Sequence, residues 1–396
     1  FCQGVRAGPP VSTERPRLMW RNKTVCGGKY SGKREGNVFF MNSNAIAAKK
    51  KADSAFMKKG VIIAILSGVT YGLYTGFLTL GMARGYWGSE WYGANTNGLS
   101  VFAITYVLAA LGSGVNDTLS GIWMVLKCAV LGELGDFFRV LKTKPGWVMI
   151  VCALIGGPIA STCYVAALQM AGTIIVPFAA LNASVGAIIG KFVFKQELNK
   201  TMVGGIIICL ICAAMIGGTS FDGFGGTTMV GILLALVCAL GWGIEGAVAG
   251  FGTTLIDYNI GITIRQCTSG LSNMIIVLPL LCMIDGNGVN AFGLLATAFT
   301  DGGSIGFFVL SGLFAGLSYG FWYKGASMCG AALGMTCNGA YAFWCPFFTW
   351  IICGLIGGID GYALTPVQWI FAAVMIIGIA MVGNLNPLNI FKKKEA

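Results

Sequence analysis

Long hydrophobic runs separated by short polar segments dominate this chain. They lie near 60–82, 98–138, 146–168, 172–194, 201–218, 229–252, 259–284, 304–325, 330–356 and 366–386. Most of them approach about 20 residues, the length with which an α-helix crosses the hydrocarbon core of a bilayer. The pattern therefore predicts an all-α polytopic membrane protein.

Composition supports this fold class and removes one class of partner. The chain is 56% hydrophobic and only 10% charged, with 60 glycines, whereas a soluble domain has about 25% charged residues. Of the net charge of +11, the first 40 residues supply +6, from eight Lys/Arg and two Glu. The remaining positive charge is what the preference of cytoplasmic loops for Lys and Arg produces. We therefore expect no nucleic-acid partner.

The first 59 residues read as a disordered, basic N-terminal segment, because they combine Gly, Pro and charge clusters with few apolar residues. Met41 opens "MNSNAIAAKKKADSAF", which resembles a natural start, and "REG" (34–36) fits a purine-rich ribosome-binding stretch just before it. We hypothesise that residues 1–40 are an over-extended reading frame. N-terminal sequencing of the native protein that found these residues would reject this hypothesis.

The basic clusters determine how often the chain crosses the membrane, because two cytoplasmic clusters must be separated by an even number of crossings. One basic cluster, Lys49–Lys51 with Lys58 and Lys59, precedes the first run, and another (Arg139, Lys142 and Lys144) follows 98–138. Both should be cytoplasmic, so 83–138 contributes one crossing. We expect "GSGVND" (112–117) to divide a re-entrant or surface helix from a span at about 116–138, with one long tilted helix as the alternative. The result is ten spans with both termini cytoplasmic.

The two halves of the chain can be aligned with each other. The aligned segments keep one order in both halves: 65–77 with 236–248, 116–123 with 265–272, and 163–172 with 322–331. Because five spans per repeat is an odd number, the second copy would enter the membrane upside down. Inverted repeats are typical of secondary transporters, whose substrate sites lie near the midplane between the repeats.

This pattern resembles the EamA-like branch of the drug/metabolite transporter superfamily, over roughly residues 60–386. The resemblance is carried by Tyr71-Gly72 and Trp242-Gly243 in the first helix of each repeat, "GWVMIVCALIGGP" (146–158), and "LNASVGAIIGKFVFKQEL" (181–198). The second repeat lacks the Lys–Glu ending of that last segment. The resemblance implies a carrier of small polar or amphipathic metabolites with five-helix repeats at 60–218 and 229–386 and a basic cytoplasmic tail at 387–396.

Glu245 is the sharpest functional candidate, because it lies deep inside the run 229–252 with no basic residue nearby in the sequence. A buried carboxylate in a membrane is costly and usually functional. In small multidrug members of the resembled superfamily, a first-helix glutamate couples proton and cation. The alternative is a structural role, in which Glu245 pairs with Arg265 or hydrogen-bonds across the bundle.

Other polar and aromatic residues at comparable depth form a candidate cavity lining. Two charged candidates lie nearer the membrane surfaces. Asp117, at the start of the second span, could face an outer vestibule, and solvation at the membrane surface is its simpler interpretation. Arg265, near the cytoplasmic face of the seventh span, could bind an anionic group or seal an inner gate, and snorkelling is its simpler interpretation. Aromatic faces with a few hydrogen-bonding groups suit a small solute. The uncharged candidates are Tyr71, Tyr74, Tyr164, Asn182, Trp242, Tyr323, Asn338 and Tyr341.

The sequence contains no motif for a cofactor. It has no histidine, and none of its Gly-rich runs ends in the Gly-Lys-Ser/Thr of a phosphate loop. We therefore predict a secondary active transporter of a small-molecule solute in the bacterial cytoplasmic membrane, surrounded by lipid, coupled to protons or sodium, and monomeric or homodimeric. Proton-coupled efflux of cationic drugs is one alternative. A membrane enzyme or sensor without transport is the alternative from another class.

Overall fold

Apolar helices make up most of the chain in the computed structural model. The structure describes residues 43–93, 96–194, 200–218, 226–252, 255–329 and 331–382, and within these ranges it contains helices and turns but no strand. The described residues from 49 onward belong to one compact unit. The predicted N-terminal segment is described only from residue 43, where α1 begins, and the predicted basic tail (387–396) lies outside the described residues.

Five helices in the described ranges are long and apolar enough to cross a membrane. Four of them coincide with one predicted run each, and the fifth, Lys144–Ala179, contains the run at 146–168 and continues into the run at 172–194. The five are Ala55–Met82, Lys144–Ala179, Gly226–Ala249, Tyr258–Asp285 and Ile305–Cys329. A sixth would be Ala103–Val130 together with Leu134–Val140, which meet at a bend of 119°. Four shorter apolar helices (Lys200–Cys212, Ala291–Thr300, Tyr341–Ile356 and Pro366–Met381) accompany them. The chain is therefore an all-α, membrane-embedded protein.

Several of the long helices are built from two or more segments. In chain order the helices are α1 (Ser43–Met82), α2 (Leu108–Val130), α3 (Leu134–Val140), α4 (Lys144–Leu154), α5 (Thr162–Ala171), α6 (Val176–Ala179), α7 (Asn182–Phe194), α8 (Lys200–Gly218), α9 (Gly226–Gly252), α10 (Tyr258–Ser272), α11 (Leu278–Asp285), α12 (Ala291–Thr300), α13 (Ile305–Cys329), α14 (Ala331–Asn338), α15 (Tyr341–Thr349) and α16 (Pro366–Val382). Wider π-helical turns join α4 to α5 at Ile155–Ser161 and α10 to α11 at Asn273–Val277, and another extends α15 over Trp350–Ile356.

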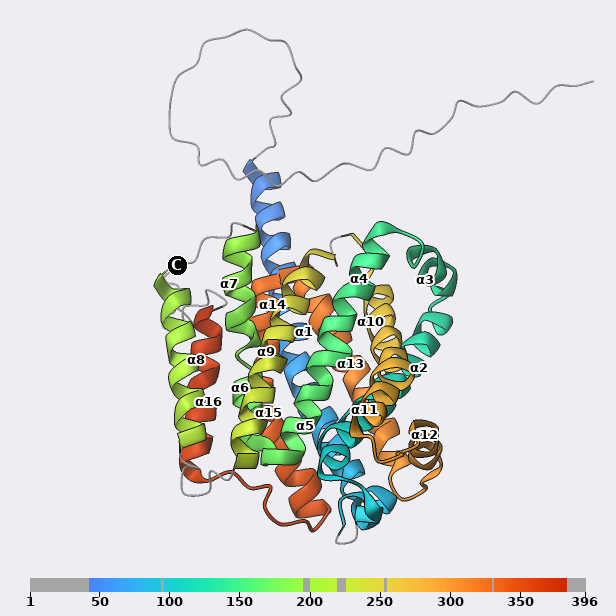
Figure 1. Ribbon diagram of the computed structural model, residues 1–396. Coiled ribbons are helices and arrows are strands. Elements are labelled where there is room, and N and C mark those ends of the chain that lie inside the picture. The colour runs from blue at the N-terminus through green and yellow to red at the C-terminus, as the bar shows by residue number, and fades with distance from the viewer. Residues whose placement is uncertain are drawn as a thin grey trace, which may run out of the picture. The chain divides into compact units, whose positions relative to one another are not determined.

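Helices far apart in the sequence pack in pairs. The most extensive contacts join α2 to α10 and α8 to α16, and α5 packs along α9 while α13 packs along α2. Figure 1 shows α8 and α16 side by side at one edge of the bundle and α2 beside α10 at the other. The short helices α3 and α12 lie at opposite ends of this second edge (Figure 1).

The expected division of 98–138 at residues 112–117 is wrong. These residues lie inside α2, and the chain instead breaks at 131–133, after which α3 turns away. Gly112 and Gly114 do not end the helix, because they serve close packing. A Cβ atom at Gly112 would lie 3.1 Å from the Met82 sulfur, and one at Gly114 would lie 3.1 Å from the Asn273 Cβ.

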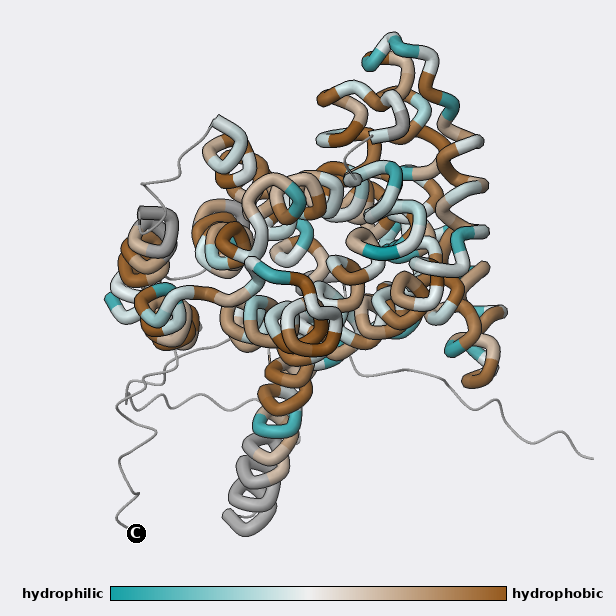
Figure 2. The backbone as a smooth tube through the Cα atoms, turned by 90° about the horizontal axis from the view of Figure 1, so that it is seen from below, coloured by the Kyte–Doolittle hydropathy of each residue, from teal (hydrophilic) through white to brown (hydrophobic). Residues whose placement is uncertain are grey.

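Apolar side chains cover the outside of the bundle, while many polar groups lie inside. Ile122, Leu126, Ile207 and Leu210 are each about half exposed, whereas Glu245, Arg265 and Gln266 are fully buried. Figure 2 shows hydrophobic stretches along most of the helical tubes. A large apolar exterior marks a surface that is in contact with something other than water, here the hydrocarbon of a membrane.

One polar connection ties two loops together outside the long apolar helices. The Asp301 carboxylate, between α12 and α13, accepts hydrogen bonds from the backbone N–H groups of Tyr86 (2.8 Å) and Gly303 (3.1 Å). Partial burial raises the pKa of Asp301, but these hydrogen bonds, with the neighbouring Ser304 hydroxyl, outweigh it and leave the pKa below its ordinary value. The ionised carboxylate therefore stabilises this connection.

Candidate functional site

A buried charge network lies where α2, α9 and α10 meet. Arg265 of α10 donates from Nε to Glu245 Oε1 of α9 at 2.9 Å, and its terminal Nη2 lies 3.5 Å from Oε2. On its other side, Nη1 lies 3.5 Å from Asp117 Oδ2 of α2. All three side chains are at most 3% exposed. The remaining ion pair between described side chains, Arg139–Asp136, lies at the surface.

Uncharged groups complete the surroundings of the guanidinium. Arg265 Nη2 donates to the Tyr319 hydroxyl at 3.1 Å and to the Gly156 carbonyl at 3.2 Å. The guanidinium carbon also lies 3.9 Å from the centre of the Tyr319 ring. Nη1 donates to the side-chain oxygen of Gln266. A buried charge is tolerated when it is both paired and hydrogen-bonded, and Arg265 meets both conditions.

The π-helical turn between α4 and α5 contains the Gly156 carbonyl, which belongs to this network. Pro158 lies inside the π-helical turn, and because proline has no N–H it removes a helical hydrogen bond there. The Gly156 carbonyl accepts from three side chains: Trp242 Nε1 at 2.9 Å, Ser161 Oγ at 3.1 Å and Arg265 at 3.2 Å. A side chain at position 156 would overlap the Glu245 carboxylate. Glycine is therefore required for the ion pair to fit.

Asp117 has its own set of hydrogen-bond donors. The Ser269 hydroxyl of α10 donates to its Oδ2, and the Asn116 side-chain amide donates to its Oδ1 at 3.1 Å. One helical turn from Asp117, Ser113 accepts from Asn273 at 3.2 Å, and Asn273 in turn accepts from Thr162 at 3.1 Å. Hydroxyl and amide groups therefore form a row between α2 and α10 that starts at Asp117.

The network contains two carboxylates and one guanidinium. With all three groups ionised it carries one excess negative charge in a place without solvent contact. An excess charge in such a place is costly. One further positive charge at the site would therefore bring its net charge to zero.

Aromatic side chains form a second cluster beside the charges. Tyr71 lies at its centre, with ring centroids 4.6 Å from Tyr341, 4.9 Å from Tyr74, 5.9 Å from Trp242 and 6.1 Å from Tyr319. Tyr164 lies 5.1 Å from Trp242, and its hydroxyl is 3.1 Å from that of Thr75. Tyr319 and Trp242 each belong to this cluster and also contact the charge network or its Gly156 carbonyl.

Two helices that line the aromatic cluster are kinked. α6 ends at Ala179 and α7 begins at Asn182, while α14 ends at Asn338 and α15 begins at Tyr341. Asn182 Oδ1 and the hydroxyls of Tyr341 and Tyr71 are buried and have no hydrogen-bond partner within the described part of the chain. Buried polar groups are nearly always hydrogen-bonded. These three atoms are therefore available to a bound solute.

The predicted site residues fall into four places. Glu245, Arg265 and Asp117 meet directly, and the Tyr323 hydroxyl lies 3.4 Å from Glu245 Oε1. Trp242, Tyr71, Tyr74, Tyr164 and Tyr341 make up the aromatic cluster. Asn338 lies apart from the charges, where its amide donates to Ser67 of α1 at 2.8 Å. Asn182 lies at the first kink.

The structure adds several residues to the predicted set, among them Gln266, Ser269, Tyr319 and Gly156. Glu245 and Arg265 form the pair that the sequence offered as the structural alternative. Tyr319 and Gly156, which contact Arg265, did not enter the predicted set. Tyr319 lies four residues before Tyr323 in "SYGFWYKG", so helical periodicity places both on one face. Gly156 carries no side-chain signal at all.

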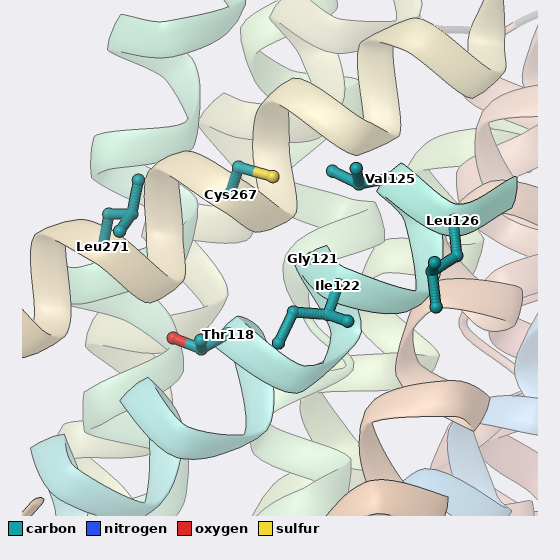
Figure 3. Close-up of a pocket in the computed structure, with 7 residues that line it drawn as sticks. All are labelled: Thr118, Gly121, Ile122, Val125, Leu126, Cys267 and Leu271. Carbon is teal, nitrogen blue, oxygen red and sulfur yellow. The ribbon is translucent and has the colours of Figure 1, made fainter. Parts of the chain in front are cut away.

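The described pockets at the surface have a different chemistry from this network. One, of about 250 Å³, lies between α2 and α10 and is lined by Thr118, Gly121, Ile122, Val125, Leu126, Cys267 and Leu271. Figure 3 shows these side chains, which carry one hydroxyl and one thiol among otherwise apolar groups. Ile122, Leu126 and Leu271 are each about half exposed. The groove therefore belongs to the apolar exterior.

Comparisons with known proteins establish the fold alone. No family model and no curated protein matches the chain. A solved structure titled only "Crystal structure of protein" aligns over 84% of this chain and 98% of its own, with 17% sequence identity and a TM-score of 0.50. The class defined so far is that of an all-helical, membrane-embedded protein with a closed polar centre.

Proposed function

We propose that this protein is a secondary active transporter of a small solute, with ten membrane-crossing helices in two inverted halves, as in EamA-like carriers of the drug/metabolite transporter superfamily. The halves would be residues 60–218 and 229–386. The bacterial cytoplasmic membrane, with both termini on the cytoplasmic side, is the proposed location. In this arrangement three of the shorter apolar helices (Lys200–Cys212, Tyr341–Ile356 and Pro366–Met381) belong to membrane crossings, whereas α12 does not.

The pairing of helices supports the inverted halves. The second helix of each proposed half, α2 and α10, packs against its counterpart, and so do the fifth helices, α8 and α16. Contact between equivalent elements is what a two-fold relation produces, because only elements near the axis can meet their own copies. The surface helices α3 and α12 follow the second span of each half and lie at opposite ends of the bundle (Figure 1).

The kinks support a solute site between the halves. Each proposed fourth helix is interrupted once, at 180–181 and at 339–340. The first helix of the opposite half closes on each kink: a Cβ at Gly243 would lie 3.2 Å from the Asn182 carbonyl, and one at Gly68 would lie 3.0 Å from that of Asn338. Interrupted helices at corresponding positions of two repeats are the usual place of a transporter's solute site.

The observation that carries the proposal is the buried Asp117–Arg265–Glu245 network at the contact between α2, α9 and α10. Ionisable groups inside a membrane bundle are expensive and mark ion or solute pathways. Alternating access would require this closed centre to open to each side in turn, driven by a coupling ion. The excess negative charge fits a proton or another monovalent cation.

A second candidate function is efflux of cationic compounds. Its support is the position of the aromatic cluster beside the excess carboxylate, because aromatic faces and carboxylates both attract organic cations. An enzyme or sensor is the third class, and the assay below separates it because only a carrier moves an unchanged solute down an imposed gradient.

Flux into proteoliposomes tests the proposal. The purified protein would be reconstituted and a pH gradient imposed, with pooled amino acids, sugars, nucleosides and cationic dyes offered in turn. Liposomes without protein and the variant Glu245→Gln would be run beside the wild type. Gradient-driven uptake or release of one pool by the wild type, and not by liposomes without protein, supports transport. Flux from no pool under either gradient direction refutes it.

A further inference from the structure

We propose that Asp117 carries the exchangeable proton of the central network, while Glu245 stays ion-paired with Arg265. This inference rests on the proposed function for its role in coupling, although proton binding itself can be measured without transport. It reverses the expectation from the sequence, in which Glu245 was the leading candidate.

The two carboxylates differ in their distances to the Arg265 guanidinium. Glu245 faces two nitrogens of the guanidinium, at 2.9 and 3.5 Å, and the Tyr323 hydroxyl approaches it at 3.4 Å. Asp117 has a single approach to Arg265, at 3.5 Å. A two-pronged arginine–carboxylate contact is stronger than a single one and holds its geometry. Arg265 is therefore neutralised by Glu245, and the excess negative charge falls to Asp117.

The remaining groups around Asp117 leave its charge uncompensated. From α10 it faces Arg265, and from α1 and α13 it faces the phenols of Tyr74 and Tyr319. Glu245 of α9 lies beyond the guanidinium. Among the described residues, Arg265 is the cation in ion-pair range of Asp117, and it already forms an ion pair with Glu245. A proton on Asp117 brings the network to zero net charge.

A proton suits this position better than a metal ion. A sodium ion bound to Asp117 would lie next to the guanidinium that already approaches the same carboxylate at 3.5 Å, and like charges at such a distance repel strongly where water is excluded. A proton adds no volume. The Ser269 hydroxyl, which donates to the ionised Asp117 Oδ2, can rotate and accept from the protonated carboxyl, because a hydroxyl is both donor and acceptor.

The row of polar groups that starts at Asp117 indicates to which side of the bundle the proton would be released. From Asp117 it continues one turn along each helix to Ser113 and Asn273, and then to Thr162 of α5. Ser113 precedes Asp117 in α2, so the row leads away from α3 and towards the end of the bundle where α12 lies (Figure 1). Proton release to that side would take this route once the bundle opens.

Infrared difference spectroscopy of the purified protein in lipid tests the inference directly. The carbonyl stretch of a buried protonated carboxyl would be followed as pH is varied. We expect such a band in the wild type, its loss in Asp117→Asn, and its retention in the control Asp360→Asn, which removes an exposed carboxyl. The double variant Glu245→Gln/Arg265→Gln removes the ion pair as a unit and should keep the band.

The outcomes separate this inference from the proposed function. A band that persists in Asp117→Asn, or no such band in the wild type at any pH, overturns the assignment. In proteoliposomes, Asp117→Asn should exchange solute between the two sides but lose solute-driven proton uptake. Unchanged proton uptake in that variant would also overturn it. If the wild type moves no solute at all, transport fails while the infrared result still decides where the proton lies.

Discussion

Replacing Arg265 with glutamine should be among the most damaging single changes in this protein. Arg265 is fully buried and pairs with Glu245, which is fully buried as well. Glutamine is shorter and uncharged, so it leaves the Glu245 carboxylate in the bundle without its counterion. The fold then has to accommodate an unpaired charge away from solvent.

The magnitude follows from the contacts that are lost. Removing one partner of a buried ion pair costs about 3–5 kcal/mol. The Tyr319 hydroxyl loses its partner at 3.1 Å, which adds about 1 kcal/mol. The Gly156 carbonyl adds little, because Trp242 and Ser161 still donate to it. The free energy of unfolding should therefore fall by about 4–6 kcal/mol.

The assay is equilibrium unfolding by sodium dodecyl sulfate in mixed micelles, followed by circular dichroism. Glu245→Gln alone should cost less than Arg265→Gln, because Asp117 remains 3.5 Å from the guanidinium and becomes its counterion when it releases its proton. The double variant should lose only about 1–2 kcal/mol, because Asp117 keeps its proton and no unpaired charge remains. The control is Arg139→Gln, whose ion pair with Asp136 is at the surface, with side chains 73% and 54% exposed. It should cost less than about 1 kcal/mol.

The double variant decides whether the reasoning is right. If its destabilisation equals the sum of those of the two single variants, Arg265 and Glu245 do not act as a pair. If Arg265→Gln matches Arg139→Gln in cost, the burial of the network is not what stabilises it.

Two further predictions concern positions next to polar groups. Gly156→Ala should destabilise the protein strongly and abolish any solute flux, because its Cβ would overlap the Glu245 carboxylate. The control is Gly320→Ala in α13, whose Cβ would meet nothing within 4 Å and which should be nearly neutral. Thermal unfolding of the two variants in parallel checks this, and equal melting temperatures would contradict it. Because the pKa of Asp301 lies below its ordinary value, its stabilising effect is present above the ordinary pKa and is lost as the pH falls through the lowered one. The melting temperature of the wild type should therefore exceed that of Asp301→Asn near neutral pH and converge with it in acid, and a difference that does not depend on pH would count against this account.

The hydrophobic runs were sufficient to place the five long apolar helices but not the interruptions of the chain. The runs at 60–82, 146–168, 229–252, 259–284 and 304–325 each correspond to a long apolar helix, because length and hydropathy alone determine such segments. The run at 98–138 was divided at the wrong place. Glycines at 112 and 114 were read as breakers, but inside a bundle they allow neighbouring helices to approach.

The sequence indicated which residues belong to the candidate site, but not which of them contact one another. A lone Glu245 and an Arg265 stand out in apolar runs, so both could be named from the sequence. Which carboxylate approaches the guanidinium with two oxygens depends on helix rotation and on the π-helical turn at Ile155–Ser161, and neither can be read from residue order. The Gly156 carbonyl is a backbone atom, so no side-chain pattern could indicate its part in the network.

The seam between α2 and α10 limits how this protein can change over evolutionary time. A Cβ at Gly270 would lie 2.6 Å from the Thr118 backbone nitrogen, and one at Gly121 would lie 3.3 Å from that of Cys267. Sequence drift at the seam is therefore restricted to the smallest residues, while outward positions such as Ile122 are free to exchange among apolar types. Distant descendants of this gene should preserve the spacing of the seam glycines long after their overall sequences have diverged.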